Sequence, residues 1–231
     1  MNSATVSIPL ALQLRRGLLR RAARSLYLLL GRVQVSGLEN IPRATPYIAA
    51  INHTSIFDAP LMLAFWPESI AAIGASDVFA KPVQGQIVSL YGATPVHRGS
   101  YDRALIDEML ATLRTGVPLL IAPEGGRSHQ PAMRRAKPGI ALIVDETGVP
   151  VLPVGIAGAT DDFLRRGLRF QRPEISMRVG MPFRLPPLAG RGEARRQARQ
   201  HNADLVMRQI ARLLPSEYHG VYAANAALDA S

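Results

Sequence analysis

The chain has 231 residues, of which 48% are hydrophobic, and it carries a formal net charge of +10. This length fits one large α/β domain better than two small ones, and the absence of cysteine excludes disulfides and thiolate metal sites. Of the 27 basic residues, Lys81 and Lys137 are the two lysines and the other 25 are arginine, which forks onto phosphate and carboxylate groups. GC-rich codon usage is an alternative cause of that bias. A surface this basic indicates an anionic partner, either a nucleic acid or a membrane surface.

Residues 8–30 combine leucine and arginine with the period of an amphipathic helix. One side of the helical wheel holds Leu12, Leu14, Leu18, Leu19, Ala22, Leu26, Leu29 and Leu30, and the other holds Arg16, Arg20, Arg21 and Arg24. This pattern predicts a helix lying in a bilayer interface, with leucines such as Leu18 and Leu26 toward the lipid and the four arginines on anionic head groups. The alternative is an amphipathic helix that packs on its own domain.

The apolar runs of the chain are too short to predict a transmembrane helix. Arginines interrupt the N-terminal apolar residues, and no small-residue cleavage site follows them, so the segment does not resemble a secretory signal. We therefore expect the protein to remain in the cytoplasm, on the cytoplasmic face of the cell membrane as a peripheral or monotopic protein.

The rest of the chain alternates apolar runs with amphipathic segments. Strands are expected at 32–37, 47–51, 69–74, 92–99, 117–122, 149–156 and 175–179, and helices at 59–66, 101–115, 139–146 and 193–214, with a short helical or irregular segment at 81–91. Pro150 and Pro153 should keep their strand short or irregular, and the strand at 175–179 is expected at an edge. Because strands and helices alternate from 33 to 156, the predicted fold class is α/β, with a mainly parallel central sheet covered by helices.

A polar segment, Asn52 to Asp58, follows the apolar strand at 47–51 and precedes the helix at 59–66. On a continuous helix the side chains of His53 and Asp58 would point about 140° apart. They can meet only if His53 lies in the loop and Asp58 in the first helical turn. Asp58 would then hold one ring nitrogen and leave the other as a base. The alternative is that Ser55 and Asp58 form a capping box and that His53 is an ordinary loop residue.

Three polar loops follow this pattern, at 52–58, 92–98 and 124–128. The first and the third clearly follow strands and precede helices, so parallel strands would deliver them to one edge of the sheet. That edge would carry a histidine, two carboxylates and the arginines Arg98 and Arg127. Glycines at 125 and 126 allow the backbone to approach a ligand closely, although a tight turn would use them equally well.

These residues resemble the glycerolipid acyltransferases typified by 1-acyl-glycerol-3-phosphate acyltransferase. Four blocks carry the resemblance in the same order and with similar spacing: Asn52-His53-x-x-x-x-Asp58, Gly92 to Arg98, Pro123-Glu124-Gly125-Gly126-Arg127-Ser128, and Val151-Leu152-Pro153-Val154. The resemblance covers roughly residues 32 to 182. Gly126 stands where the family has threonine, and Pro95 and His97 make the second block less apolar than usual. These departures concern the choice of acceptor more than acyl transfer itself.

The resemblance implies a mechanism without metal or cofactor, in which acyl-CoA or an acyl carrier protein supplies the acyl thioester as co-substrate. His53 takes the proton from a glycerol hydroxyl, and Asp58 fixes the tautomer of His53. Arg98 and Arg127 hold the phosphate of the acceptor lysophosphatidate. The other residues expected at the acceptor site are Asn52, Glu124, Gly125, Gly126 and Ser128.

The implied organisation is an N-terminal amphipathic, membrane-associating helix at 1–31 followed by an α/β acyltransferase domain at 32–231. The expected partners are an anionic membrane surface, a lyso-lipid acceptor and the thioester donor, and the sequence predicts no oligomeric state. Acyl transfer to another lyso-lipid, such as lyso-ornithine lipid, is an alternative because those enzymes share the same blocks. A nucleic-acid partner is disfavoured because aromatic residues make up only 6% of the chain and no binding motif is present. The intact His53 and Asp58 argue against a catalytically silent lipid binder.

Overall fold

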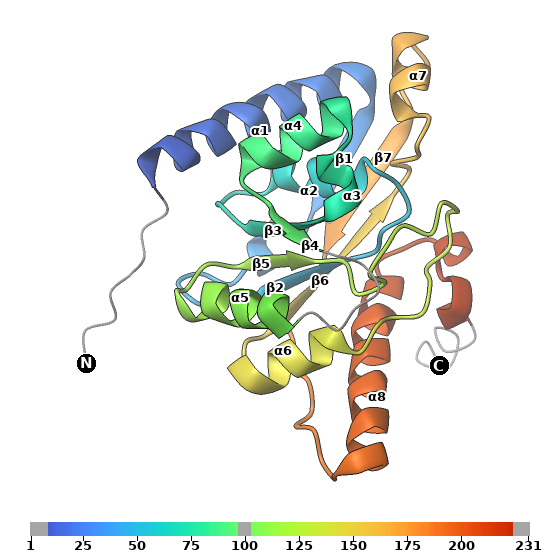
Figure 1. The fold of residues 1–231 in the computed structure, drawn as a ribbon. Helices are drawn as coiled ribbons and strands as arrows, with labels where there is room; N and C mark the ends of the chain where they lie inside the picture. Colours follow the sequence, from blue (N-terminus) through green and yellow to red (C-terminus); the bar gives the residue numbers. More distant parts are fainter. Residues whose placement is uncertain (1–8, 97–102, 224–231) are drawn as a thin grey trace.

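A seven-stranded sheet runs through the middle of the protein in the computed structural model, which describes residues 9–96 and 103–223 (Figure 1). The strands are β1 (Arg32–Ser36), β2 (Ile48–Ile51), β3 (Ala71–Ala75), β4 (Thr94–Val96), β5 (Leu119–Ile121), β6 (Val151–Ala157) and β7 (Glu174–Val179). Their order is β1-β7-β6-β2-β5-β3-β4, and every neighbouring pair is parallel except β6 and β7. The predicted α/β class with a mainly parallel sheet is confirmed.

Helices cover both faces of this sheet (Figure 1). One face carries α1 (Leu10–Leu30), α2 (Asp58–Phe65), α3 (Ser76–Phe79), α4 (Pro82–Tyr91) and α7 (Phe163–Leu168), and the other carries α5 (Arg103–Arg114), α6 (Gly139–Thr147) and α8 (Gly192–Ala211). Successive residues of β2 alternate between the two hydrophobic cores, with Ala49 and Ile51 in one and Ile48 and Ala50 in the other. This alternation follows from the two-residue period of a strand and explains why β2 is apolar throughout.

Two expectations about individual strands are wrong. The strand at 175–179 is not an edge strand, because β7 lies between β1 and β6. The prolines do not shorten β6, which runs from Val151 to Ala157 and is buried along its whole length. Pro153 is tolerated because it lies opposite the end of β7, where its carbonyl still accepts a hydrogen bond from the Gly180 amide (2.9 Å).

The arginine side of α1 faces the domain. The Arg16 guanidinium is buried and donates to the carbonyl oxygens of Tyr91 (2.8 Å) and Gly92 (3.3 Å) and to the Ser69 hydroxyl (2.9 Å). It also lies 4.7 Å from the centre of the Tyr91 ring. These carbonyls end α4, where the last turn of a helix leaves acceptors without intrahelical donors and the dipole favours a cation. Arg16 therefore caps α4, and the prediction that it contacts lipid head groups is wrong.

Two further arginines of α1 also turn toward the protein. Arg20 donates to the Glu68 carbonyl oxygen (3.3 Å), and the Arg24 guanidinium lies 5.2 Å from the centre of the Phe65 ring. Arg21 is exposed. The outward side of the helix consists of leucines that are 65–73% exposed, Leu10, Leu14, Leu18 and Leu29. The helical wheel separates the two sides only in part, because Leu30 is buried and Leu19 packs against the core although both lie on its leucine side. Over the described residues, no helix combines the length and apolarity needed to cross a bilayer.

Asn52 joins the ends of two neighbouring strands instead of contacting a substrate. It follows β2 directly, and its fully buried amide donates to the Ile156 carbonyl oxygen and accepts from the Ile156 amide, both at 2.8 Å. Both polar atoms of the side chain are used within the sheet. The expectation that Asn52 binds the acceptor is therefore wrong, and its role is structural.

We predict that Asn52→Ala destabilises the domain by about 2–4 kcal/mol, because two buried groups of Ile156 lose their only side-chain partner. Denaturant unfolding followed by circular dichroism measures this. Gln86→Ala, on the exposed side of α4, is the control and should change the free energy of unfolding by less than about 0.5 kcal/mol. An Asn52→Ala protein as stable as wild type would contradict the assignment.

Candidate active site

His53 and Asp58 meet as the sequence predicts, with the histidine in the loop after β2 and the carboxylate at the start of α2. The distance from His53 Nδ1 to Asp58 Oδ2 is 3.3 Å. The same oxygen accepts hydrogen bonds of 2.7 Å from the amides of Thr54 and Ser55. The Ser55 hydroxyl also accepts from the Phe57 amide at 3.2 Å. The capping arrangement and the histidine contact therefore coexist on one buried carboxylate.

The environment of Asp58 determines how the His53 ring can act. Burial raises the pKa of Asp58, while His53 and the amides of Ser55 and Thr54 work in the opposite direction. The carboxylate oxygen can accept only from a protonated Nδ1, which leaves Nε2 with a lone pair. Within the described part of the chain nothing is hydrogen-bonded to Nε2, and the ring side chain is 19% exposed. The arrangement can therefore accept a proton from a molecule in the solvent.

Glu124 holds the histidine loop against the loop that follows β5. Its Oε1 accepts from the His53 amide (2.8 Å) and its Oε2 accepts from the Arg134 amide (2.7 Å). The Ser128 amide donates to the His53 carbonyl oxygen (2.9 Å) and completes the connection. Burial raises the pKa of Glu124 to about 7, although the two backbone hydrogen bonds oppose this shift. Because both oxygens bind backbone amides, Glu124 positions His53, and its expected place at the acceptor site stays a prediction.

Local backbone geometry explains a glycine in the 124–128 loop. Gly125 has a φ of +66°, and a Cβ there would lie 2.7 Å from the Lys137 side chain. The positive φ is the reason for glycine at 125, because the end of the flexible Lys137 side chain could move away from a Cβ. Gly126 is partly buried, and the Ser128 hydroxyl donates to the Gln130 carbonyl oxygen (2.6 Å). Lys137 is a cation beside this loop that the sequence patterns did not single out.

Arg127 reaches Asp161, a residue that the sequence interpretation missed. Arg127 NH1 lies 3.6 Å from Asp161 Oδ2, and the other carboxylate oxygen accepts from the Ser55 hydroxyl (2.7 Å) and the Ile56 amide (3.0 Å). Burial works to raise the pKa of Asp161, but these hydrogen bonds and Arg127 outweigh it and the pKa lies below its usual value. Asp161 follows β6, whose carboxyl end lies beside that of β2. The rule that predicted the other loops could therefore have found it.

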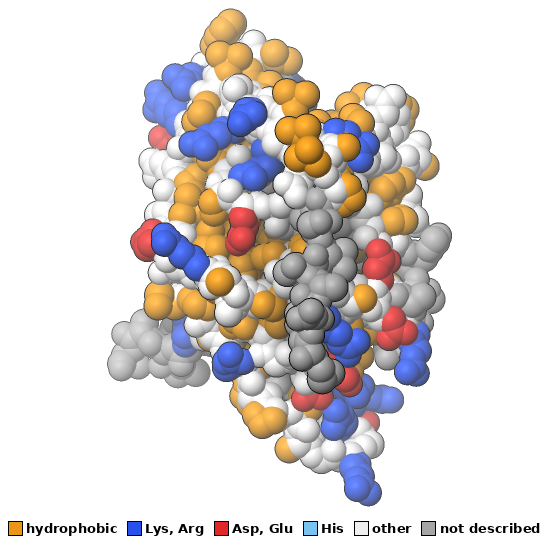
Figure 2. Space-filling view, turned by 90° about the vertical axis from the view of Figure 1, so that its left-hand side faces the viewer, with side chains coloured by type: hydrophobic (Ala, Val, Ile, Leu, Met, Phe, Trp, Pro, Cys, Tyr) orange, Lys and Arg blue, Asp and Glu red, His pale blue; other side chains and the backbone are white. Residues whose placement is uncertain are grey.

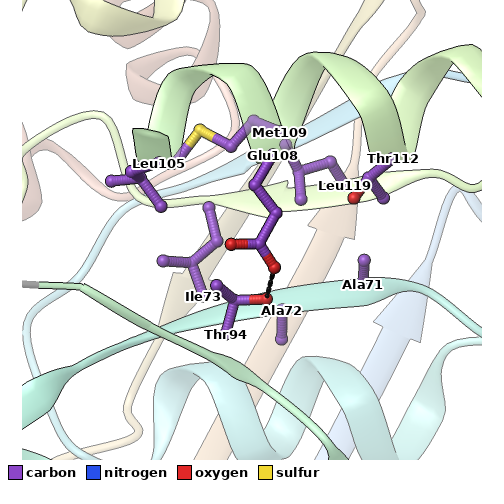
Figure 3. A pocket seen from close by; sticks show the side chains of 9 residues that line it. All are labelled: Ala71, Ala72, Ile73, Thr94, Leu105, Glu108, Met109, Thr112 and Leu119. Carbon is purple, nitrogen blue, oxygen red and sulfur yellow. Dashed lines mark hydrogen bonds between the residues drawn. The ribbon is translucent and has the colours of Figure 1, made fainter. Parts of the chain in front are cut away.

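Two further features complete the description of the site and its surroundings. Arg98 is outside the residues that the structure describes. A small pocket lies between β3, β4 and α5, where Glu108 accepts a hydrogen bond from Thr94 (2.9 Å) (Figure 3). None of its lining residues comes from the loops that carry His53 or Arg127. Among residues 9–96 and 103–223, no three histidine, aspartate or glutamate side chains gather as a metal site would require.

We predict that ionisation of Glu124 destabilises the fold. Its pKa is about 7 in the folded protein against an ordinary value of 4.5, so its contribution is present below pH 4.5 and is lost as the pH rises toward 7. The loss should be on the order of 3 kcal/mol. At low pH, Glu124→Gln should be less stable than wild type, because only one end of the glutamine amide can accept a hydrogen bond. The glutamine side chain does not titrate, so its contribution does not change with pH. The stability gap between the variant and wild type should shrink between pH 4.5 and 7.5 in urea unfolding. A gap that stays constant over this pH range would refute the prediction.

Comparisons with known proteins identify the family of the chain. The family model described as Acyltransferase matches residues 32–157. The chain is 32% identical over 187 residues to the lyso-ornithine lipid O-acyltransferase of Pseudomonas aeruginosa, which covers 73% of this chain and 69% of that protein. It is 30% identical over 131 residues to a chloroplastic 1-acyl-sn-glycerol-3-phosphate acyltransferase of Brassica napus, covering 55% of this chain and 38% of that protein.

The human 1-acyl-sn-glycerol-3-phosphate acyltransferase alpha is 27% identical over 164 residues, covering 70% of this chain and 56% of that protein. The chain thus spans less than two thirds of the plant and human relatives. The crystal structure of the 1-acyl-sn-glycerophosphate acyltransferase PlsC from Thermotoga maritima shares the fold, with a TM-score of 0.59, 24% identity, and coverage of 83% of this chain and 78% of that one. Since the family model matches more than half of its 231 residues, the chain belongs to the Acyltransferase family.

Proposed function

We propose that the protein transfers a fatty acyl group from an acyl thioester to the free hydroxyl of a lyso-lipid, with lysophosphatidate as the acceptor and phosphatidate as the product. The observation that carries this proposal is the contact between His53 Nδ1 and the buried Asp58 carboxylate, which leaves Nε2 available at the sheet edge. Membership of the Acyltransferase family and relatives named 1-acyl-sn-glycerol-3-phosphate acyltransferase support it.

The chemistry follows from the position of the base. His53 Nε2 takes the proton of the acceptor hydroxyl as its oxygen attacks the thioester carbonyl carbon. The tetrahedral intermediate then collapses, the carbon–sulfur bond breaks, and the imidazolium returns the proton to the leaving thiolate. The products are an ester and a free thiol, of coenzyme A or of an acyl carrier protein. Asp58 stabilises the imidazolium while it exists. This sequence of steps uses neither a metal nor an acyl-enzyme.

The acceptor phosphate is proposed to lie against Arg127. Its pairing with Asp161 spans 3.6 Å and Asp161 is 47% exposed, so the contact is weak enough for a phosphate to replace it. The Lys137 side chain runs past Gly125 in the same loop region and adds a second cation. Arg98 is proposed to contribute as the sequence blocks imply.

Lyso-ornithine lipid is the second candidate acceptor. The relative from Pseudomonas aeruginosa, named lyso-ornithine lipid O-acyltransferase, is 32% identical over 187 residues. Arg127 distinguishes the two candidates physically, because a phosphomonoester carries close to two negative charges whereas the ornithine head group has no phosphate. The acceptor preference therefore tests the role of Arg127.

The membrane partner is proposed to contact α1 through its leucine side. Leu14 and Leu18 are 65% and 69% exposed, whereas Arg16 is engaged inside the domain. Arg21 lies on the exposed side and can reach anionic head groups. The α1 stripe, defined as Leu10, Leu14, Leu18 and Leu29, would rest the protein on the cytoplasmic face of the membrane, where its acceptor resides. Vesicle flotation of Leu14→Ser/Leu18→Ser tests this contact.

We predict that His53→Ala lowers kcat roughly 10²–10⁴-fold, the usual contribution of a positioned general base. Asp58→Asn should also slow transfer, since a neutral amide does not stabilise the imidazolium. His201→Ala, at an exposed position on α8, is the control and should keep the wild-type rate. The assay follows labelled acyl thioester into the lipid product. Wild-type turnover by a folded His53→Ala protein would exclude the proposed role.

We predict that Arg127→Ala raises KM for lysophosphatidate about tenfold or more, the effect of losing one charge-assisted hydrogen bond. KM for the acyl thioester should stay nearly unchanged, as should both constants for the exposed control Arg114→Ala. The experiment compares lysophosphatidate with lyso-ornithine lipid for wild type and both variants. If wild type prefers the ornithine lipid, or if Arg127→Ala loses donor affinity instead, the phosphate assignment fails and the second acceptor replaces the first.

A further inference from the structure

The segment after β6 exposes large apolar side chains between arginines. Its sequence from 163 to 172 is FLRRGLRFQR, and it comprises α7 and the turn that follows. Phe170 is 90% exposed and Leu168 is 69% exposed. We define the α7 tip as five exposed side chains of this segment: Leu164, Arg165, Leu168, Arg169 and Phe170. The sequence analysis predicts lipid contact for residues 8–30 but not for this segment.

The base of the α7 tip is fixed firmly to α1. Phe163 is fully buried and stacks on Tyr27 of α1, with ring centres 5.1 Å apart. Gly167 lies so close to α1 that a Cβ there would be 2.6 Å from the Leu30 side chain. One guanidinium nitrogen of Arg172 donates to the carbonyl oxygens of Leu28 (3.2 Å) and Gly31 (3.3 Å) at the end of α1. The base of the segment is therefore packed against α1, while the side chains of the tip are exposed.

The backbone holds Phe170 outward at a local cost. Phe170 has a φ of +58° and Arg172 a φ of +43°, in the left-handed region that bulky residues rarely adopt. Strain of this kind persists where the surrounding structure enforces it, and it often marks a functional position. The consequence here is an aromatic ring in solvent beside cationic side chains.

The charge around the tip favours an anionic partner. Arg165, Arg166, Arg169 and Arg172 contribute four positive charges between residues 162 and 174, against two negative charges from Asp162 and Glu174. Arg165 pairs with Asp162 at 3.1 Å and its side chain is still 65% exposed. Within this segment, arginines alternate with leucine and phenylalanine. That alternation suits the interface of an anionic bilayer, where apolar groups enter the acyl boundary and cations meet head groups.

The base of the α7 tip lies beside the histidine loop and beside the end of α1. The Phe163 ring lies 5.4 Å from that of Phe57, the residue before Asp58, in an edge-to-face contact. Figure 1 places α7 next to the C-terminal end of α1, where Leu29 is 73% exposed. Figure 2 views the molecule from the side of the N-terminal end of α1 and shows hydrophobic side chains interspersed with lysine and arginine at its upper end.

We propose that the α7 tip is a second lipid contact, in which Leu164, Leu168 and Phe170 enter the interface of an anionic bilayer and Arg165 and Arg169 bind its head groups. Together with the α1 stripe, the tip gives the protein two contacts with the membrane. The base of the α7 tip adjoins the loop that carries His53 and Asp58. The inference deepens the proposed function, because it places the entrance for a lipid acceptor at the membrane surface. The contact itself does not depend on which acceptor is used.

Flotation with vesicles of phosphatidylcholine, with and without phosphatidylglycerol, tests the contact in the full chain. Leu168→Ser/Phe170→Ser should lower the partition coefficient on anionic vesicles about tenfold or more, because two large apolar groups leave the interface. Arg165→Gln/Arg169→Gln should weaken binding to anionic vesicles only, and added salt should erase that difference. The matched control Met181→Ser/Val221→Ser removes side chains that are 70% and 63% exposed elsewhere, and it should bind as wild type.

Phe170→Trp reports insertion at the tip directly. The natural Trp66 is fully buried, so a blue shift of the added emission on anionic vesicles arises at position 170, whereas Met181→Trp should not shift. Unchanged flotation of the tip variants, equal losses in the control, or no shift at 170 would overturn the proposal. Acyl transfer to a detergent-dispersed acceptor should be unaffected in the tip variants. If no acceptor is acylated but tip-dependent flotation remains, the lipid contact stands and the proposed function fails.

Discussion

The arrangement of the site depends on one buried carboxylate, that of Asp58. Its Oδ2 accepts the amides of Thr54 and Ser55 at 2.7 Å and lies 3.3 Å from His53 Nδ1. A buried anion is costly unless hydrogen bonds surround it, and here those bonds come from the loop that bears the histidine. These hydrogen bonds to Oδ2 hold the loop, and the loop orients the ring, while the buried Oδ1 has no hydrogen-bond partner within the described residues. One oxygen of Asp58 thus both ties the loop to the start of α2 and contacts the base.

Three neighbouring strand ends reinforce that loop. Glu124, after β5, binds the His53 amide, and Asp161, after β6, binds Ser55 and Ile56. Asn52 locks the end of β2 to β6 through Ile156. Parallel strands deliver their carboxyl ends to one edge, so residues distant in sequence all act on a single loop. Several polar residues of the sequence blocks thus hold the histidine loop in place.

The sequence predicts periodic helices and strands well, but it predicts the hydrogen-bond partners of polar side chains poorly. The strands around β2 and β5, and the meeting of His53 with Asp58, follow from apolar runs and from the turn that the spacing requires. The roles of Asn52 and Glu124 do not follow, because a polar residue beside a histidine looks the same whether it faces a ligand or a backbone amide. The prediction that Arg16 contacts lipid fails for a similar reason, because the carbonyl groups that Arg16 binds lie 75 and 76 residues away in the chain. Asp161 was missed because its loop carries no motif.

The tautomer of His53 tests the central claim most directly. Long-range proton–nitrogen NMR correlation on protein labelled with ¹⁵N-histidine distinguishes the two nitrogens of each neutral ring, and His53→Gln assigns the signal among the five histidines. The account predicts that Nδ1 carries the proton and that Nε2 is unprotonated, because Asp58 can only accept. A neutral ring with its proton on Nε2 would contradict it, since no base would then face the acceptor hydroxyl.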